Sequence, residues 1–313
     1  MKQVSVVIPV FGRENVFETL EVLQGSAYFD CLKIIIVDNG NAVALHDRLL
    51  SVQNSSVEVV SLPENMGGSG GYIAGVEHAM KHHPESEYIW LLDDDAKPND
   101  GTLPGLIDSF EYLKCKGIEN VACMGSAVLN MSDPELISEC GADFSMWKWK
   151  VFCRKAGEKM SGQDGIPHTV EYCSGCSVLI PREVIDKTGF WENVFIHYDD
   201  IEWGLRVHRK FGYDCYATTK STVLHPPSSA TKSGGQWIVY YDLRNLFWMC
   251  AKFNKFALVY WLMLMSLKVL AATILGKPSD AWVYWRFAIL DFIRGRRRTR
   301  KQIVEALNMI RKK

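Results

Sequence analysis

The alternation of strand and helix patterns over the first hundred residues most constrains the fold. Apolar, β-branched runs at Val4–Val10 (VSVVIPV) and Leu32–Val37 (LKIIIV) are typical of parallel strands buried on both faces. Further strands are expected at Val57–Leu62 and Tyr88–Leu92, with helices at about 14–24, 43–52 and 70–82 between them. This order predicts an α/β domain with a central, mostly parallel sheet that binds ligands beyond the carboxyl ends of its strands.

The distribution of charge excludes a protein that is basic over its whole surface. The 313-residue chain carries 35 Lys or Arg and 36 Asp or Glu, a formal net charge of −1. Ten of the basic residues lie between Arg286 and the C-terminal end, against two acidic residues in the same stretch. Because the positive charge is confined to this tail, we expect no nucleic-acid partner.

The nine cysteines predict reduced thiols in a cytosolic compartment. Cys173 and Cys176 have CxxC spacing, but neither a second CxxC nor a matching histidine pair accompanies them, so we expect no zinc site there. The apolar run at the N-terminus is too short for a signal peptide.

The chain is expected to divide near residue 235, into a catalytic domain at 1–235 and a helical region at 236–313. Within the first part, a strand at Tyr172–Ile180 and a polar-faced helix at Asp200–Phe211 are expected. In the second part, Phe256–Gly276 is apolar over 21 residues, with Lys268 as its one charge. This stretch reaches the roughly 20 residues that a membrane span needs.

Aromatic and basic residues around that stretch favour a peripheral, monotopic anchor over a span. Basic Arg294–Lys301 (RGRRRTRK) suits an anionic membrane surface. Aromatic residues of the kind that lie at a membrane interface are Trp261, Trp282, Tyr284 and Trp285. A homo-oligomer is the alternative, because helix packing between subunits would bury the same apolar surface.

Three consecutive aspartates, Asp93, Asp94 and Asp95, follow the fourth expected strand. If the strand continued through them, Asp93 and Asp95 would point to one side and Asp94 to the other. Two carboxylates on one side suit Mg²⁺ or Mn²⁺ bridged to a diphosphate. The alternative is a solvated acidic turn, and the fully apolar strand before the triplet favours the metal.

Other candidate residues fall at the ends of neighbouring strands. Arg13 follows the first strand, Asp38 ends the second, and the glycine-rich segment Asn65–Gly71 opens a helix after the third. This segment lacks the P-loop Lys-Ser/Thr and the dinucleotide-binding glycine spacing, so it is either a close approach to a ligand or a flexible helix start.

Two further candidate groups lie downstream. Asp199 and Asp200 begin a helical stretch, where a carboxylate either caps the helix or serves as a general base. His225 follows an apolar run and precedes Pro226. A lone histidine is more often structural than a ligand, and only the nearby acids raise it above that expectation.

Taken in order, SVVIPVFGR, IIIVDNG, ENMGGSGG, LLDDD, HYDDIEWGLR and LHP resemble the family 2 glycosyltransferases of the GT-A fold. The resemblance covers roughly residues 3–230. Within the family, the glycine-rich segment, the aspartate triplet and DDIEWGLR look closest to bacterial galactofuranosyltransferases and related rhamnosyltransferases.

The resemblance implies roles for individual residues. Asp93 and Asp95 would bind Mn²⁺ or Mg²⁺, with His225 as the third protein ligand. Asp200 would be the catalytic base, with Asp199 as second choice because Asp-Asp stands where many relatives have Glu-Asp. Trp191 and Glu192 would line the sugar or acceptor pocket. The expected nucleotide-sugar contacts are Pro9, Arg13, Asp38, Asn65, Gly67 and Asp94.

These roles predict an inverting transfer from a nucleotide-diphosphate sugar, with UDP-galactofuranose as first donor and dTDP-rhamnose as runner-up. The membrane-seeking tail predicts a lipid-linked or polysaccharide acceptor in cell-surface glycan (O-antigen or capsule) synthesis, at the cytoplasmic face of a bacterial inner membrane.

Two other classes of protein remain open at this point. A sugar nucleotidyltransferase would carry a glycine-rich, basic loop directly after the first strand, where this chain has PVFGR. A non-catalytic glycan-binding protein would not need both acidic motifs.

Overall fold

The computed structural model describes residues 2–226, 237–276 and 280–311. The chain forms two compact units. The first unit comprises Met1–Phe144, Val151–Asn193 and Asp199–Pro227. The second comprises Ser145–Lys150, Val194–Tyr198 and Ser228–Lys313. The boundary expected near residue 235 falls within 227–236, outside the described residues.

A ten-stranded sheet forms the centre of the first unit, with the strand order β10-β12-β6-β11-β4-β1-β2-β3 and with β5 and β7 paired off this path. The first four strands are β1 (Val4–Val10), β2 (Leu32–Asp38), β3 (Val57–Ser61) and β4 (Tyr88–Leu92). The later strands are β5 (Lys97–Pro98), β6 (Val121–Asn130), β7 (Asp133–Glu139), β10 (His168–Val170), β11 (Ser177–Pro181) and β12 (Asp214–His225). A separate two-stranded sheet contains β8 (Ala142–Ser145) and β9 (Lys150–Cys153).

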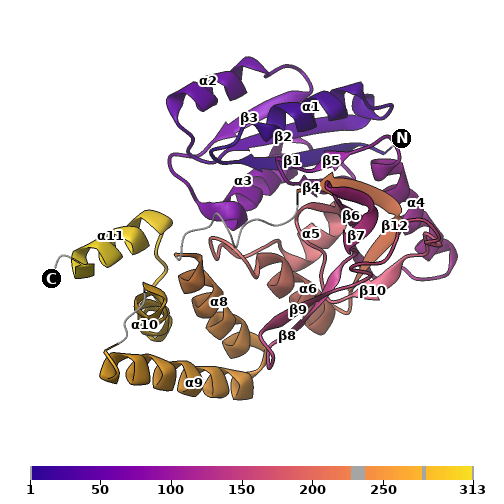
Figure 1. The fold of residues 1–313 in the computed structure, drawn as a ribbon. Coiled ribbons are helices and arrows are strands. Elements are labelled where there is room, and N and C mark those ends of the chain that lie inside the picture. Colours follow the sequence, from indigo (N-terminus) through magenta and orange to yellow (C-terminus); the bar gives the residue numbers. More distant parts are fainter. Residues whose placement is uncertain (1, 227–236, 277–279, 312–313) are drawn as a thin grey trace. The chain divides into compact units, whose positions relative to one another are not determined.

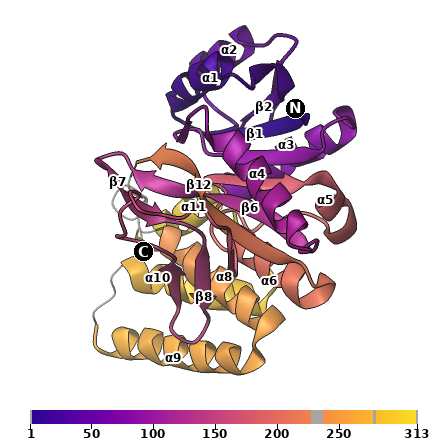
Figure 2. The ribbon, with the colours of Figure 1, turned by 90° about the vertical axis from the view of Figure 1, so that its right-hand side faces the viewer.

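The α/β class expected from the sequence is confirmed, and the sheet is parallel over its first four strands. β3, β2, β1 and β4 pair in parallel, whereas β11 is antiparallel to both β4 and β6. β12 pairs with β6 in parallel, and Figure 2 shows the two strands side by side. β12 therefore runs in the same direction as β4, and the two strands end at the same edge of the sheet.

Helices cover both faces of this sheet. Figure 1 shows α1 and α2 on one side of the first strands and α3 on the other. Two apolar cores correspond to these layers: one includes residues of α1, α2 and α4, and the other includes residues of α3, α5 and α6. The helices of the first unit are α1 (Asn15–Gly25), α2 (Val43–Ser51), α3 (Gly67–His82), α4 (Thr102–Cys115), α5 (Arg182–Thr188) and α6 (Asp199–Phe211), with a 3₁₀ turn at Phe29–Cys31.

Glycines in α3 allow this helix to pack closely on the sheet. A Cβ at Gly75 would lie 2.3 Å from Val7 Cγ1, and a Cβ at Gly71 would lie 2.8 Å from Pro9 Cβ. The glycine-rich segment is thus largely helical, and its glycines at 71 and 75 serve contact between the helix and β1. Pro9, expected to contact the nucleotide, contributes to this packing.

The second unit contains four helices within the described residues: α8 (Ile238–Phe253), α9 (Lys255–Ile274), α10 (Asp280–Ile293) and α11 (Arg300–Arg311). Asp291 is fully buried and accepts hydrogen bonds from Tyr240 Oη at 3.1 Å and Arg298 Nε at 2.5 Å. Arg300 lies over the Trp237 ring at 4.7 Å. Two arginines of the basic Arg294–Lys301 stretch are therefore held by partners inside this unit.

Helix α9 is long and apolar enough to cross a membrane by length and composition. A single helix of this kind also occurs in the core of soluble proteins. Trp261 and Tyr284, expected at a membrane interface, are instead buried, and Trp261 Nε1 donates to Met146 O at 2.7 Å. The exposed apolar side chains of α9 include Phe256, Val259, Tyr260, Met263, Leu267, Leu270 and Ile274.

A short segment of the second unit has an unusual backbone. Phe195, His197 and Tyr198 have positive φ angles of 76°, 62° and 75°. Such a conformation costs non-glycine residues about 1–2 kcal/mol each. Asn245 Nδ2 compensates by lying within hydrogen-bonding distance of three carbonyl oxygens of this segment, at 2.8–3.2 Å.

Candidate functional site

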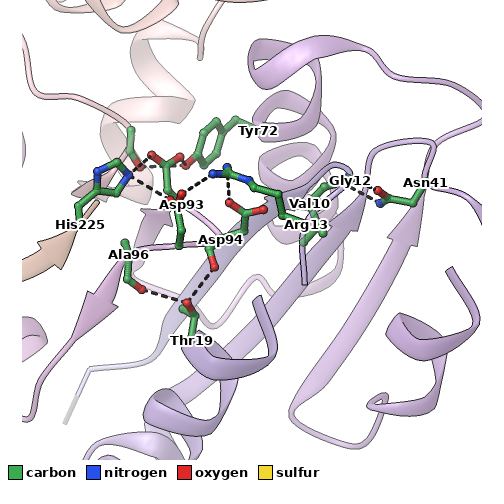
Figure 3. A network of polar contacts seen from close by, with 12 residues as sticks. Val10, Gly12, Arg13, Thr19, Asn41, Tyr72, Asp93, Asp94, Ala96 and His225 are labelled. Atoms are coloured by element: carbon green, nitrogen blue, oxygen red, sulfur yellow. Dashed lines mark hydrogen bonds and ion pairs between the residues drawn. The ribbon is translucent and has the colours of Figure 1, made fainter. Parts of the chain in front are cut away.

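Several segments of the first unit meet at one edge of the sheet. The chain leaves β1, β2, β4 and β12 at this edge, and the segment before the antiparallel β11 arrives there. Parallel strands bring their carboxyl ends together, which explains how residues far apart in sequence meet. Figure 3 shows the resulting network of polar contacts.

The aspartate triplet lies in a turn, because β4 ends at Leu92. The strand alternation expected to separate the three carboxylates therefore does not apply. Asp93 Oδ1 accepts a hydrogen bond from Tyr72 Oη at 2.7 Å, and Asp93 Oδ2 lies 3.5 Å from His225 Nε2. In Figure 3, Asp93 lies between the His225 ring and the Tyr72 hydroxyl.

Asp95 contacts the same histidine and also an arginine. His225 Nε2 lies 3.0 Å from Asp95 Oδ1, and Arg13 Nη1 donates to Asp95 Oδ2. Burial by itself would raise the pKa of Asp95, but the hydrogen bond and charge of His225, together with the charge of Arg13, lower it. Asp95 is therefore an anionic side chain in the interior of the cluster.

Asp94 points to Arg13 instead of His225. Arg13 Nη2 donates to Asp94 Oδ1 at 2.6 Å, and the carboxylate is 2% exposed. Burial and the neighbouring carboxylates raise the pKa of Asp94 to about 7, against the opposing effect of Arg13. Thr19 Oγ1 lies 2.9 Å from Asp94 O and 3.0 Å from Ala96 O, which holds the turn itself.

The donor atoms around His225 fit a divalent cation. One donor atom each from Asp93, Cys176 and His225 lie within 4.8 Å of one another. Although burial disfavours its protonation, hydrogen bonds to Asp93 and Asp95 and their charges raise the pKa of His225 to about 10. Asp93 and Asp95 thus stabilise the protonated, positively charged His225, and a bound cation would supply the same positive charge. The carboxylate ligands suit Mn²⁺ and Mg²⁺.

The sequence predicted no metal site at the Cys173 and Cys176 pair, yet the thiol of Cys176 lies within this group of potential ligand atoms. Burial and nearby acids raise the pKa of its thiol well above 9.0, so it remains a neutral thiol. The other half of the CxxC, Cys173, donates to Tyr216 O at 3.1 Å. All nine cysteines lie among the described residues and are free, as expected.

Asp38 ends β2 and has partners within the first unit. Its Oδ1 accepts from the Asn41 backbone at 3.0 Å and side chain at 2.6 Å, while Oδ2 lies 2.5 Å from His46 Nδ1. Despite burial, these hydrogen bonds lower the pKa of Asp38. Asn41 also accepts from Gly12 N at 2.6 Å and donates to Val10 O at 2.9 Å. It therefore ties together the loops after β1 and β2.

The start of α3 is held by two asparagines. Asn39 accepts from Met66 N at 2.8 Å and donates to Gly67 O at 2.9 Å. Asn65 Oδ1 accepts from Gly67 N at 2.8 Å, and Gly67 has a positive φ of 78°. Asn65 and Gly67, expected to contact the nucleotide, thus form the helix start beside the end of β2.

Trp191 lies beside Tyr72, the residue that contacts Asp93. The rings of Trp191 and Tyr72 meet edge to face at 5.2 Å, and Phe190 stacks on Trp191 at 5.0 Å. Trp191 is 7% exposed, and its Nε1 is buried without a hydrogen-bond partner. Glu192, partly buried, follows Trp191 directly.

Asp199 and Asp200 form the first turn of α6. Asp200 Oδ1 accepts from Ile201 N at 2.7 Å, and Asp199 is 8% exposed. Burial, the charge of Asp199 and that of Glu139 raise the pKa of Asp200 well above 3.8. Glu139, at the end of β7, was not selected from the sequence, and burial raises its pKa as well.

The remaining residues of the DDIEWGLR motif hold the segment that carries Trp191. Glu202 Oε1 accepts from Arg206 Nε at 2.8 Å, and the Arg206 guanidinium donates to Thr188 O and Phe190 O at 2.6 and 2.7 Å. Trp203 Nε1 donates to Gly189 O at 2.9 Å. The motif therefore has a positioning function that a search for catalytic acids does not reveal.

Comparisons with known proteins find similar sequences and similar folds. Residues 5–118 match the model of glycosyl transferase family 2. The galactofuranosyltransferase GlfT1 of Mycolicibacterium smegmatis is 25% identical over 194 residues, covering 62% of this chain and 61% of the relative. The galactofuranosyltransferase GlfT2 of Mycobacterium tuberculosis is 24% identical over 195 residues, covering 58% of this chain and 30% of the relative. The matched part is thus less than two thirds of these relatives.

Two solved structures share the fold. GalNAc-T7, whose crystal structure contains UDP, GalNAc and Mn²⁺, has a TM-score of 0.55 and 16% identity, covering 72% of this chain and 44% of its own. The mannosyltransferase PcManGT of Pyrobaculum calidifontis, solved with GDP-Man and Mn²⁺, has a TM-score of 0.52 and 15% identity, covering 93% and 87%. Residues 5–118 therefore match glycosyl transferase family 2, and the chain has a GT-A-like fold and sequence similarity to the galactofuranosyltransferases.

Proposed function

We propose that this protein is an inverting, metal-dependent glycosyltransferase that takes its sugar from a nucleotide diphosphate. The observation that carries the proposal is the convergence of Asp93, Asp95 and His225 at the sheet edge of a family 2 domain. The similarity to galactofuranosyltransferases supports UDP-galactofuranose as donor.

The donor's diphosphate is assigned to this cluster. Asp93, Asp95 and His225 would hold Mn²⁺ or Mg²⁺, whose chemistry is to offset the charge on the departing nucleotide diphosphate. GalNAc-T7 and PcManGT, solved with Mn²⁺, support a divalent ion. Arg13, which is half exposed and pairs with Asp94 and Asp95, is placed to exchange these partners for a phosphate oxygen.

Proton removal is assigned to Asp200, with Asp199 as the alternative. A general base is most effective when its pKa approaches the working pH, and burial raises the pKa of Asp200 in that direction. Asp200 would take the proton of the acceptor hydroxyl as that oxygen attacks the anomeric carbon from the face opposite the leaving group. This single displacement inverts the configuration without a covalent glycosyl-enzyme.

The acceptor is proposed to be a lipid-linked or polysaccharide glycan of the bacterial cell surface, such as an O-antigen or capsule. The exposed apolar face of α9, which includes Phe256, Met263 and Leu267, supports peripheral attachment to the cytoplasmic face of the inner membrane. Exposed Lys268 on the same helix suits anionic lipid.

A panel of sugar nucleotides tests the proposal. The protein is incubated with Mn²⁺, a lipid-linked acceptor and either UDP-galactofuranose, UDP-galactopyranose or dTDP-rhamnose, and the product's anomeric configuration is determined. Transfer with inversion from UDP-galactofuranose is expected. Transfer from dTDP-rhamnose alone would reassign the donor, and release of pyrophosphate from a nucleoside triphosphate and a sugar phosphate would indicate a nucleotidyltransferase.

A further inference from the structure

A second cluster of metal-ligating side chains lies at the other end of α3 from the candidate active site. Donor atoms of Glu58, His78 and His83 lie within 4.8 Å of one another. His78 Nε2 is 2.6 Å from Glu58 Oε2, and His83 Nε2 is 3.1 Å from Glu58 Oε1. The 16-residue α3 extends about 24 Å from its glycine-rich start to this cluster.

The fold brings these three residues together from β3 and the end of α3. In β3, Val57 and Val59 pack in the core on the α1 side, while Val60 packs in the core on the α3 side. Because side chains alternate along a strand, Glu58 points to the α3 side. His78 lies in the penultimate turn of α3, and His83 directly follows the helix.

His83 is held rigidly. Its backbone N–H donates to Ala79 O at 3.0 Å, and its carbonyl accepts from Arg182 Nη1 at 3.1 Å. The side chain is buried, with Nδ1 3.4 Å from Glu85 Oε1. A carboxylate at the far ring nitrogen is the usual arrangement for a metal-binding histidine, because it leaves the other nitrogen's lone pair free for the metal.

The ring nitrogen of His83 that faces Glu58, Nε2, forms no hydrogen bond of normal geometry. Nε2 is fully buried and makes no well-aligned hydrogen bond, although Glu58 Oε1 is 3.1 Å away. When Nδ1 carries the proton, the Nε2 lone pair faces a carboxylate oxygen, which is repulsive. A cation between Nε2 and Glu58 would convert this repulsion into two bonds.

We propose that Glu58, His78 and His83 bind a divalent transition-metal ion, with Zn²⁺ the preferred one. The separations of 2.6 and 3.1 Å lie within about 1 Å of the roughly 3.4 Å between tetrahedral zinc ligands. Two imidazoles and one carboxylate favour Zn²⁺ over Mg²⁺ or Ca²⁺. The partly exposed His78 leaves room for water as fourth ligand, with the exposed His82 stacked beside it at 4.5 Å.

The bound ion would join the edge strand of the sheet to the helix behind it. β3 is the last strand in the sheet order, and Glu58 lies within it. An ion that binds the folded chain and not the unfolded one raises the melting temperature in proportion to the logarithm of its concentration. The site is therefore structural, and it is distinct from Asp93, Asp95 and His225.

Zinc titration of the full chain tests the proposal. The starting protein carries Asp95→Asn and His225→Gln, so that zinc at the candidate catalytic cluster is not counted, and it is stripped with a chelator. Calorimetry at pH 7 should show one tight equivalent of Zn²⁺ that excess Mg²⁺ does not displace. Thermal unfolding should shift upward with added Zn²⁺.

Further substitutions in this protein identify the ligands. His78→Gln and Glu58→Gln should each weaken zinc binding by at least about 100-fold, because even second-shell changes cost roughly 10–100-fold. His82→Gln is the matched control, since it removes an exposed neighbouring imidazole, and it should bind as before. His83 is not replaced, because substitution of this buried side chain would disturb folding.

The alternative is an ion pair between protonated histidines and Glu58, which requires no metal. Absence of a tight zinc equivalent, or equal binding by the His78→Gln, Glu58→Gln and His82→Gln proteins, would overturn the proposal. Circular dichroism of each metal-free protein establishes that the variants are folded.

Discussion

His225 Nε2 lies 3.0 Å from Asp95 Oδ1, although 130 positions separate the two residues in the chain. The contact exists because β4 and β12 run in the same direction and end at one edge of the sheet. It makes His225 part of the aspartate cluster, whereas a lone histidine is more often structural.

Replacement of His225 by Gln should weaken metal-dependent binding of UDP by about tenfold or more, because one imidazole ligand is lost. Calorimetric titration of UDP with and without Mn²⁺ measures this effect. His208→Gln is the control, since His208 is exposed and paired with Asp214. Equal Mn²⁺ dependence in both variants would remove His225 from the metal site.

Tyr72→Phe should reduce metal affinity through Asp93. The Tyr72 hydroxyl donates to the carboxylate at 2.7 Å, and loss of such a second-shell hydrogen bond costs roughly 10–100-fold in metal affinity. Activity measured against Mn²⁺ concentration should therefore show a higher half-saturation value with little change at saturating metal. A fall in kcat with an unchanged half-saturation value would contradict this assignment.

Asp200→Asn should lower kcat by about 10²–10⁴-fold while UDP binding is retained, because a positioned base contributes that factor. Asp199→Asn, one position away in the same helix turn, is the matched comparison. If Asp199→Asn shows the greater loss, the base is Asp199. Substantial turnover in both variants would exclude both residues.

The pH profile of the wild-type enzyme provides a separate test of the base. The pKa of Asp200 is raised above 3.8, so the active anionic form is reached only at higher pH. The rate at saturating substrate should therefore rise with pH along a limb whose apparent pKa lies above 3.8. A rate already at its plateau near pH 4 in folded enzyme would argue against this residue.

Asp38→Asn should destabilise the fold by about 1–3 kcal/mol at neutral pH, because the partly buried donors of Asn41 and His46 lose a buried anionic acceptor. The folded pKa of Asp38 is lowered from 3.8, so this contribution is present above pH 3.8 and is lost as pH falls through the lower folded value. Urea unfolding at several pH values measures it. Exposed Asp30→Asn, the control, should change stability little.

Met263→Glu with Leu267→Glu should reduce binding to anionic lipid vesicles, because both side chains are 61% exposed on α9 and acidic replacements oppose insertion. Cosedimentation with vesicles measures the bound fraction. Val43→Glu, at a 74% exposed position of α2, is the control. Undiminished binding of the α9 variant would favour an oligomer contact or another attachment site.

The sequence by itself determined the strand and helix order of the first hundred residues. Apolar runs such as Ile34–Val37 are buried on both faces of the sheet between helix layers, so local pattern and final structure agree. The motif order also predicted a resemblance to the family 2 glycosyltransferases, and the match of residues 5–118 to the model of that family confirms it. Reading the triplet as continued strand was wrong, because three adjacent acids at a strand end form a turn whose shape depends on Arg13, Thr19 and His225.

Tertiary structure alone decided which residues support the chemistry. Tyr72 lies in no motif, yet its hydroxyl contacts Asp93. Asn39 lies in the IIIVDNG motif, but only the structure shows that its side chain holds the start of α3. The tertiary structure also buried Trp261, which composition had placed at a membrane interface. Local sequence determines the chemistry of a side chain and whether its segment has the apolar periodicity of a helix or of a strand. Its neighbours depend on strand order and helix packing, which arise from contacts between distant parts of the chain.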